Sequence, residues 1–178
     1  MSDVAADHDH YHRLLALLDD GKARYRVIDH DPEGRTDRVS ALRDNDLAQA
    51  AKCIVVLVKQ GKKVTRYVLA VVPGDARVDL AAVKAEMAGT YVGFAARDVA
   101  ERLSGSVSGT ILPFSFDAAL ELIVDPALLA HDEVYFNAAR LDRSLALRTE
   151  DYLALAHPRV APIAMADESG DGERPTID

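Results

Sequence analysis

The pattern of apolar and polar residues along the chain predicts a series of short helices and strands. The clearest pattern is a pair of strands over residues 52–59 (KCIVVLVK) and 64–72 (VTRYVLAVV), which are joined by residues 60–63 (QGKK). Two runs of β-branched and other apolar residues around a short polar turn are typical of a β-hairpin. Both strands are apolar at almost every position, so we expect both faces of the hairpin to be covered.

Helices are predicted where apolar residues recur at helical spacing. They are expected over residues 10–18, 79–89, 97–103 and 150–157, with Asp79 as the N-cap of the second and Thr149 as the N-cap of the fourth. A further helix is expected to begin with Thr36 or Asp37 as its cap. Its buried face would carry Val39, Leu42 and Leu47. Further strands are predicted over residues 25–29, 91–95, 120–124, 134–137 and 144–147. Residues 1–9 are predicted to form a loose tail.

These elements predict an α+β domain. Strands outnumber helices and do not alternate strictly with them, which excludes a parallel doubly wound sheet. We expect a mixed, mainly antiparallel sheet with helices packed around it, in a single domain over residues 1–157. Residues 158–178 carry proline, glycine and acidic residues without periodicity, which predicts a C-terminal tail with a disordered end.

Composition narrows the class of protein. A length of 178 residues fits one domain rather than two. No apolar run approaches the ~20 residues that a membrane-spanning helix needs, so we expect no membrane partner. The N-terminal segment lacks the features of a signal peptide, and a single cysteine allows no intrachain disulfide, so a cytoplasmic protein is expected. A net charge of −8 argues against broad coating of nucleic acid but allows a small basic site to hold one RNA end.

Several residues carry chemistry that a fold can use. Lys52 begins an apolar strand, either as a solvated strand end or as a cation that holds an anionic oxygen in a cleft. Residues 109–113 (GTILP) form either an ordinary turn or a backbone that positions a water or stabilises an oxyanion. His30 and Thr36 flank a loop. In the simpler interpretation His30 is a surface residue and Thr36 is a helix cap. In the other, both are functional groups, with His30 as an acid, a base or a ligand. Asn137 interrupts an apolar run and needs hydrogen-bond partners if it is buried.

Two other patterns have simpler readings. His8, His10 and His12 could chelate a metal ion if the segment were extended, but they fit a solvated tail better because a tail lacks groups that fix the ligands. Cys53 follows Lys52 in the same strand, so the two side chains point to opposite faces and a core thiol is expected. Phosphate-binding loops, zinc patterns and serine-nucleophile motifs are missing from the sequence.

Taken together, six segments resemble one known family. Within residues 20–157 the following segments occur in this order: EGRT near residue 36, AAKCIVVLVK, YVLAVVPGD, ARDVAERLSGSVSGTILPF, LIVDP and VYFNAARLDRS. They resemble the YbaK/prolyl-tRNA synthetase-associated editing domain family. The resemblance implies a mixed, curved sheet surrounded by helices. It also implies a trans-editing aminoacyl-tRNA deacylase, a hydrolase that cleaves the ester of a small mischarged amino acid on tRNA, with tRNA(Pro) expected.

The resemblance also assigns roles to residues. It places Lys52 and Gly109 in catalysis, and places the following residues in substrate binding: His30, Thr36, Thr110, Pro113 and Asn137. The lysine would hold the terminal nucleotide. The backbone of the GTILP loop would position a water, with help from the ribose 2′-hydroxyl, and neither a metal nor another cofactor is implied. The expected partners are the 3′ end of aminoacyl-tRNA and prolyl-tRNA synthetase, and DNA is not expected.

The substrate remains open in the sequence. Some family members that remove alanine carry asparagine after the lysine and His-Pro before the late strand, whereas this chain has Cys53 and Glu133 at those positions. The amino acid is therefore left open among small ones such as Cys, Ala, Ser and Pro. Two other functions also fit the sequence: a module that binds aminoacyl-tRNA or a synthetase without hydrolysis, and a hydrolase of small esters on the same fold.

Overall fold

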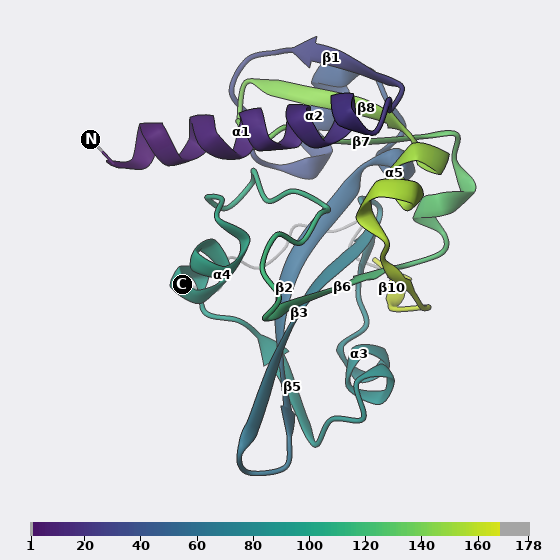
Figure 1. The fold of residues 1–178 in the computed structure, drawn as a ribbon. Helices are drawn as coiled ribbons and strands as arrows, with labels where there is room; N and C mark the ends of the chain where they lie inside the picture. Colours follow the sequence, from purple (N-terminus) through teal and green to yellow (C-terminus); the bar gives the residue numbers. More distant parts are fainter. Residues whose placement is uncertain (1, 168–178) are drawn as a thin grey trace.

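The computed structural model describes residues 2–167 (Figure 1). Its helices are α1 (Ser2–Asp20), α2 (Thr36–Arg43), α3 (Leu80–Glu86), α4 (Arg97–Ser104) and α5 (Thr149–Ala156), with 3-10 turns η1 (Leu47–Gln49) and η2 (Leu128–Ala130). Its strands are β1 (Tyr25–Asp29), β2 (Ala51–Gln60), β3 (Val64–Pro73), β4 (Ala76–Val78), β5 (Tyr91–Phe94), β6 (Leu120–Val124), β7 (Glu133–Asn137), β8 (Arg143–Arg148), β9 (Arg159–Val160) and β10 (Ala164–Ala166).

The strands form three sheets. The largest has the order β5-β2-β3-β6-β9, in which β2 pairs antiparallel with β3 and β5 while β6 runs parallel to β3 and β9. An antiparallel sheet has the order β1-β8-β7, and β4 pairs antiparallel with β10. A single bridge between Ala50 and Tyr135 joins the start of β2 to β7. The predicted α+β class with a mixed sheet is confirmed.

The predicted hairpin supplies two adjacent inner strands, β2 and β3, of the larger sheet. β2 and β3 pair from Ala51–Pro73 to Gln60–Val64 without interruption. Alternate residues enter two hydrophobic clusters, so that Val55 and Val71 lie in the first and Val56 and Val68 in the second. The expectation that both faces are covered is confirmed for this half of the hairpin, because side chains alternate across a strand.

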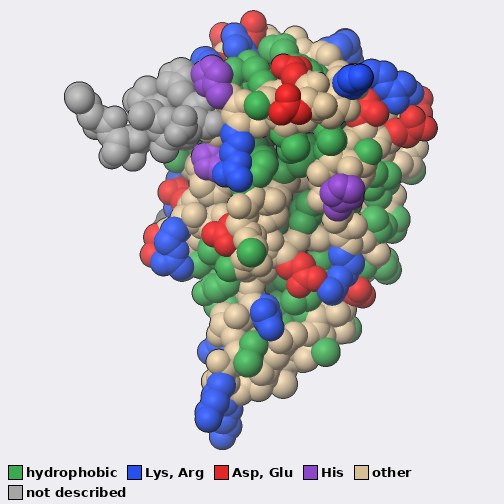
Figure 2. All heavy atoms as spheres, viewed as in Figure 1, with side chains coloured by type: hydrophobic (Ala, Val, Ile, Leu, Met, Phe, Trp, Pro, Cys, Tyr) green, Lys and Arg blue, Asp and Glu red, His purple; other side chains and the backbone are tan. Residues whose placement is uncertain are grey.

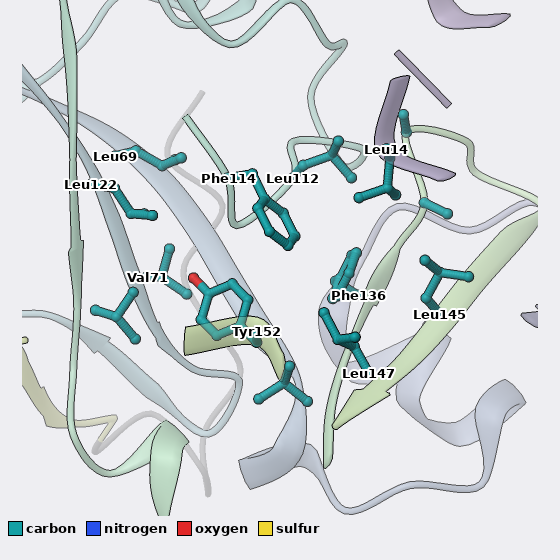
Figure 3. Close-up of a cluster of buried hydrophobic side chains, with 14 of the residues drawn as sticks. Leu14, Leu69, Val71, Leu112, Phe114, Leu122, Phe136, Leu145, Leu147 and Tyr152 are labelled. Carbon is teal, nitrogen blue, oxygen red and sulfur yellow. The ribbon is translucent and has the colours of Figure 1, made fainter. Parts of the chain in front are cut away.

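The first cluster fixes the end of the loop that follows α4. Figure 3 shows Leu112 and Phe114 of this loop directed into the core toward Tyr152 and Phe136. The rings of Phe114 and Tyr152 meet edge to face with centroids 5.2 Å apart, and the Tyr152 hydroxyl donates to the carbonyl of Pro113 at 2.7 Å. The loop is therefore anchored in the core immediately after the GTILP segment.

Both ends of the described chain contain more structure than the sequence predicts. Helix α1 begins at Ser2, so a loose tail over residues 2–9 was wrong; alanine favours helix, and acidic residues suit a helix N-terminus. Strands β9 and β10 lie in the predicted C-terminal tail, where Ile163 is fully buried. The carboxylate of Asp125 accepts from the backbone N–H of Ile163 at 2.9 Å. Such long-range contacts leave no local periodicity. Residues 168–178 lie outside the described part.

Helix ends show which capping predictions hold. Asp79 accepts from the N–H of Ala82 at 3.1 Å, so its predicted role is confirmed. The predicted caps at Thr36 and Thr149 were wrong, because each is the first helical residue, and the Thr149 hydroxyl donates instead to the carbonyl of His131. Leu42, which was expected to be buried, is 48% exposed. No helix among residues 2–167 is long and apolar enough to cross a membrane.

Candidate functional site

A pocket of about 160 Å³ lies at the start of β2, where four segments from distant parts of the sequence meet. Helix α2 and the residues before it form one wall, and the start of β2, the GTILP loop and the end of β7 form the others. The lining residues are Gly34, Thr36, Val39, Arg43, Ala51, Lys52, Cys53, Gly109, Ile111, Phe136 and Asn137. Four of the seven residues predicted for the site therefore line one pocket: Thr36, Lys52, Gly109 and Asn137.

Lys52 and Cys53 contribute chemically different groups to the pocket. The ammonium group of Lys52 donates to the carbonyl of Ala76 at 2.6 Å. Cys53 packs against the first hydrophobic cluster, as expected for a core thiol, yet it also lines the pocket, which the prediction of an opposite face did not include. Burial raises the pKa of the Cys53 thiol. Because the thiolate is the nucleophilic form, this thiol is a poor nucleophile at neutral pH.

Asn137 ties two pocket walls together. It is 7% exposed, and its Nδ2 donates to the carbonyls of Gly109 at 2.8 Å and Glu33 at 3.0 Å. Its Oδ1 accepts from the Ser144 hydroxyl at 2.9 Å. The amide orientation is fixed by this pattern, because the opposite orientation would set Oδ1 against two carbonyl oxygens. Asn137 thus holds the GTILP loop at a set distance from the loop before α2.

Two glycine backbones form the narrowest contact of this wall. Gly109 has a φ of +88°, in the region that favours glycine. A Cβ at Gly109 would lie 2.9 Å from the Cα of Gly34, which is backbone and cannot swing away as a flexible side chain can. The close approach therefore requires glycine at position 109, and it brings the backbone of the GTILP loop to the pocket surface.

The other three predicted site residues do not line the pocket. His30 lies outside it, with Nε2 2.6 Å from the Ser144 hydroxyl and Nδ1 2.8 Å from the carbonyl of Asp31. Thr110 is 1% exposed and donates to the carbonyl of Val107 at 2.7 Å. Pro113 is buried with its carbonyl paired to Tyr152. Each holds a loop that borders the pocket.

Two residues that the sequence did not single out connect the groups around the pocket, Arg43 in its lining and Ser144 buried behind it. Ser144 links His30, Asn137 and Arg43, whose Nη1 donates to the Ser144 hydroxyl at 3.2 Å. Arg43 is 7% exposed, and burial lowers its pKa to about 10. It follows Val39 by four residues, which puts both on one face of α2. That spacing was the available signal for Arg43, whereas Ser144 in an apolar strand gave none.

The pocket contains little acid–base chemistry of its own. Among the described residues, no histidine or carboxylate lines it, and no group of three or more His, Cys, Asp and Glu side chains is placed to hold a metal ion. Glu133, one of the two noted departures from the alanine-removing members, forms an ion pair with Arg26 at 3.2 Å and does not line the pocket. The arrangement offers hydrogen-bonding backbone and two cations, which suits binding and positioning of an oxygen-rich substrate.

Replacing Asn137 with aspartate is expected to destabilise the protein. The carboxylate has the same shape but cannot donate, so the carbonyls of Gly109 and Glu33 lose their partner and face negative charge. An unsatisfied buried group costs about 1–3 kcal/mol, so we expect a loss of about 2 kcal/mol or more and a fall in Tm of about 4–8 °C. Thermal unfolding by circular dichroism measures this.

Asn45→Asp is the matched control for that substitution. The Oδ1 of Asn45 accepts from Arg43 Nε at 3.0 Å, so an aspartate there gains a cationic partner, although it loses the donation to the carbonyl of Asp46. We expect a clearly smaller fall in Tm than for Asn137→Asp. Equal falls for the two variants would show that Asn137 does not hold the two loops together.

Comparison with known proteins places the chain in a defined group. The model of the aminoacyl-tRNA editing domain family matches residues 30–155. The chain is 38% identical over 161 residues to the multifunctional Ser/Thr-tRNA deacylase ProXp-y of Escherichia coli strain K12, and the match covers 90% of this chain and 96% of that protein. The protein of the same name from Escherichia coli O157:H7 matches equally well.

Solved structures share the fold. The hypothetical protein APE2540 superposes with a TM-score of 0.75 at 22% identity, covering 85% of this chain and 99% of that chain. A candidate trans-editing enzyme for prolyl-tRNA synthetase superposes with a TM-score of 0.72 at 20% identity, covering 88% and 98%. At these identities the likeness shows the fold alone. All the pocket-lining residues lie within the segment that the family model matches.

Proposed function

The chain belongs to the aminoacyl-tRNA editing domain family and is an aminoacyl-tRNA deacylase, and from this premise we propose that it acts in trans on a small amino acid attached to the wrong tRNA. The observation that carries the proposal is the single pocket that gathers Lys52, Gly109, Thr36 and Asn137 inside the family segment. Serine and threonine are the first substrates to test, because the relative from Escherichia coli is named a Ser/Thr-tRNA deacylase. tRNA(Pro) is one candidate carrier, and the cytoplasm is the proposed compartment.

The size of the pocket favours the aminoacyl end of the substrate. Pockets that enclose drug-sized ligands measure roughly 300–1,000 Å³, so about 160 Å³ holds a small aminoacyl group while most of the terminal adenosine lies outside. We assign Lys52 to the terminal nucleotide, through a phosphate oxygen. A lysine ammonium group is a compact charge with several donors and suits this role.

The proposed reaction is direct attack by water. A water oxygen adds to the ester carbonyl carbon, the bond to the ribose 3′-oxygen breaks, and that oxygen leaves with a proton as the free hydroxyl, which releases the amino acid. Since no histidine or carboxylate among the described residues lines the pocket, we assign the proton transfer to the ribose 2′-hydroxyl. The backbone of Gly109 positions the water and the ester, and positioning alone can lower a barrier by several kcal/mol.

A panel of charged tRNAs tests the proposal. tRNA(Pro) carrying Ser, Thr, Ala, Cys or Pro is incubated with the protein beside correctly charged Ser- and Thr-tRNA, and ester loss is followed against buffer. We expect rapid loss of serine or threonine esters. Binding of the tRNAs without loss of any ester would favour a binding module. Equal rates on small aminoacyl esters without tRNA would favour a small-ester hydrolase.

A further inference from the structure

A cluster of positive charge lies at the far end of the β2–β3 hairpin. We call Lys59, Lys62, Lys63 and Arg66 the basic hairpin tip. Residues 59–66 contain no acidic residue, and three of the six lysines of the chain lie among them, although the net charge of the chain is −8. Figure 2 shows Lys and Arg side chains gathered at this narrow lower end of the molecule.

Acidic side chains of the described residues do not neutralise these cations. All four side chains are exposed, and within residues 2–167 none of the four forms an ion pair. Several arginines elsewhere are neutralised by a carboxylate, as Arg24 is by Asp151 and Arg143 is by Asp29. Like charges that are close together repel one another, so an unneutralised cluster is better explained by an anionic partner than by solubility.

The tip is held at a fixed place relative to the pocket. Gln60 Nε2 donates to the carbonyl of Met87 at 2.6 Å, and the N–H of Gly61 donates to the Thr90 hydroxyl at 3.0 Å. Lys52 at the pocket and Lys59 at the tip lie on the same uninterrupted strand. At roughly 3.3 Å per residue they are about 23 Å apart along it, which corresponds to several nucleotides of RNA.

Two exposed aromatic side chains lie on β5, Tyr91 beside the tip and Phe94 nearer the pocket on the opposite face of the strand. Tyr91 is 56% exposed and Phe94 is 62% exposed, and both belong to β5, the edge strand beside β2. Tyr91 pairs in register with Lys59, whose ammonium lies 5.7 Å from the ring centroid, and Phe94 pairs with Val56, nearer the pocket. Exposed aromatic faces beside lysines are typical of surfaces that bind RNA, because bases stack on the rings and phosphates meet the cations.

We propose that the basic hairpin tip and the exposed edge of β5 bind the RNA of the acceptor arm, several nucleotides from the 3′ end. The identity of this RNA as tRNA rests on the proposed function. The surface adds no chemistry to ester hydrolysis. It raises the affinity for full-length tRNA over that for the bare aminoacyl end, which explains how a small pocket in an acidic protein holds a large polyanion.

The test is binding of uncharged tRNA by fluorescence anisotropy over a series of salt concentrations. The double variant Lys62→Gln/Lys63→Gln removes two phosphate contacts, so we expect affinity to fall about tenfold at low salt. The slope of log affinity against log salt is expected to decrease by about one to two. Lys62→Arg/Lys63→Arg keeps the charges and is expected to bind like the wild type. Lys22→Gln, at an exposed lysine outside the hairpin, shows the effect of losing one charge elsewhere on the surface.

Each outcome decides for or against the surface. Equal affinities and salt slopes for the wild type and the glutamine variant would overturn it, as would a wild type that binds no tRNA at low salt. If the glutamine variant still bound tRNA but no longer bound anionic lipid vesicles, the tip would be a membrane-binding site, and the proposed RNA surface would also be overturned. Because the assay uses uncharged tRNA, the expected pattern together with a failed deacylation panel would refute the proposed function and leave the RNA surface in place.

Discussion

Gly109→Ala is expected to lower deacylation at least 100-fold while the protein still folds. The φ of +88° costs an alanine roughly 1–2 kcal/mol, and its Cβ would meet the backbone of Gly34 at 2.9 Å. The GTILP loop must shift to relieve this contact, and a displacement of about 1 Å in a positioning group can cost about 100-fold in rate. Single-turnover hydrolysis of the best substrate in the panel measures the loss.

Gly61→Ala separates backbone strain from the contact. Gly61 has a φ of +78°, and a Cβ there meets nothing within 4 Å. Its fall in Tm therefore reports the strain alone, and we expect Gly109→Ala to be less stable than Gly61→Ala by the cost of the shifted loop. Full deacylation activity in Gly109→Ala, measured below its unfolding transition, would show that the backbone at this position does not place the reacting groups.

Lys52→Met is expected to lower kcat/KM about 10- to 150-fold. The substitution keeps an unbranched apolar stem but removes the ammonium group, whose charge we assign to a phosphate oxygen. Hydrogen bonds to charged groups contribute about 1.5–3 kcal/mol, and each 1.36 kcal/mol corresponds to a tenfold change in rate. We expect most of the effect in KM if the lysine holds the nucleotide in the ground state, and in kcat if its contact strengthens only in the transition state.

Two controls separate a loss of the Lys52 charge from a general loss of stability. Lys52 also donates to the carbonyl of Ala76, so Lys52→Met removes that hydrogen bond and some loss of stability is expected. Thermal unfolding of the variant shows whether the assay temperature is still below Tm. Lys52→Arg keeps the charge in another geometry and is expected to retain more activity than Lys52→Met. Equal activity of the two variants would show that the positive charge of Lys52 does not contribute to deacylation.

The sequence was sufficient to predict those elements of the fold that depend on residues close together in the chain. The β2–β3 hairpin and the cap at Asp79 follow from apolar runs and turn residues, and the structure has both. It was insufficient to predict elements that form through contacts between residues far apart in the chain. The strand β10 depends on Asp125, about forty residues earlier, and the local pattern of residues 158–166 gave no sign of it.

The candidate site divides in the same way. Lys52 and Asn137 were identifiable as polar residues in apolar strands, and both line the pocket. Thr110 and Pro113 belong to the same motif as Gly109, yet their groups pair with Val107 and Tyr152 inside the protein. A motif specifies which loop forms the site, but only the packed structure shows which of its atoms reach the pocket surface.

The most direct test of the central claim is one time course. tRNA(Pro) carrying serine or threonine, at a concentration below KM, is mixed with catalytic amounts of wild-type protein, with Lys52→Met or with buffer, and the remaining ester is measured. We expect rapid hydrolysis by the wild type and a rate at least tenfold lower for Lys52→Met, once the buffer rate is subtracted from both. Hydrolysis at the same rate by both proteins would place the reaction outside this pocket and contradict the role assigned to Lys52.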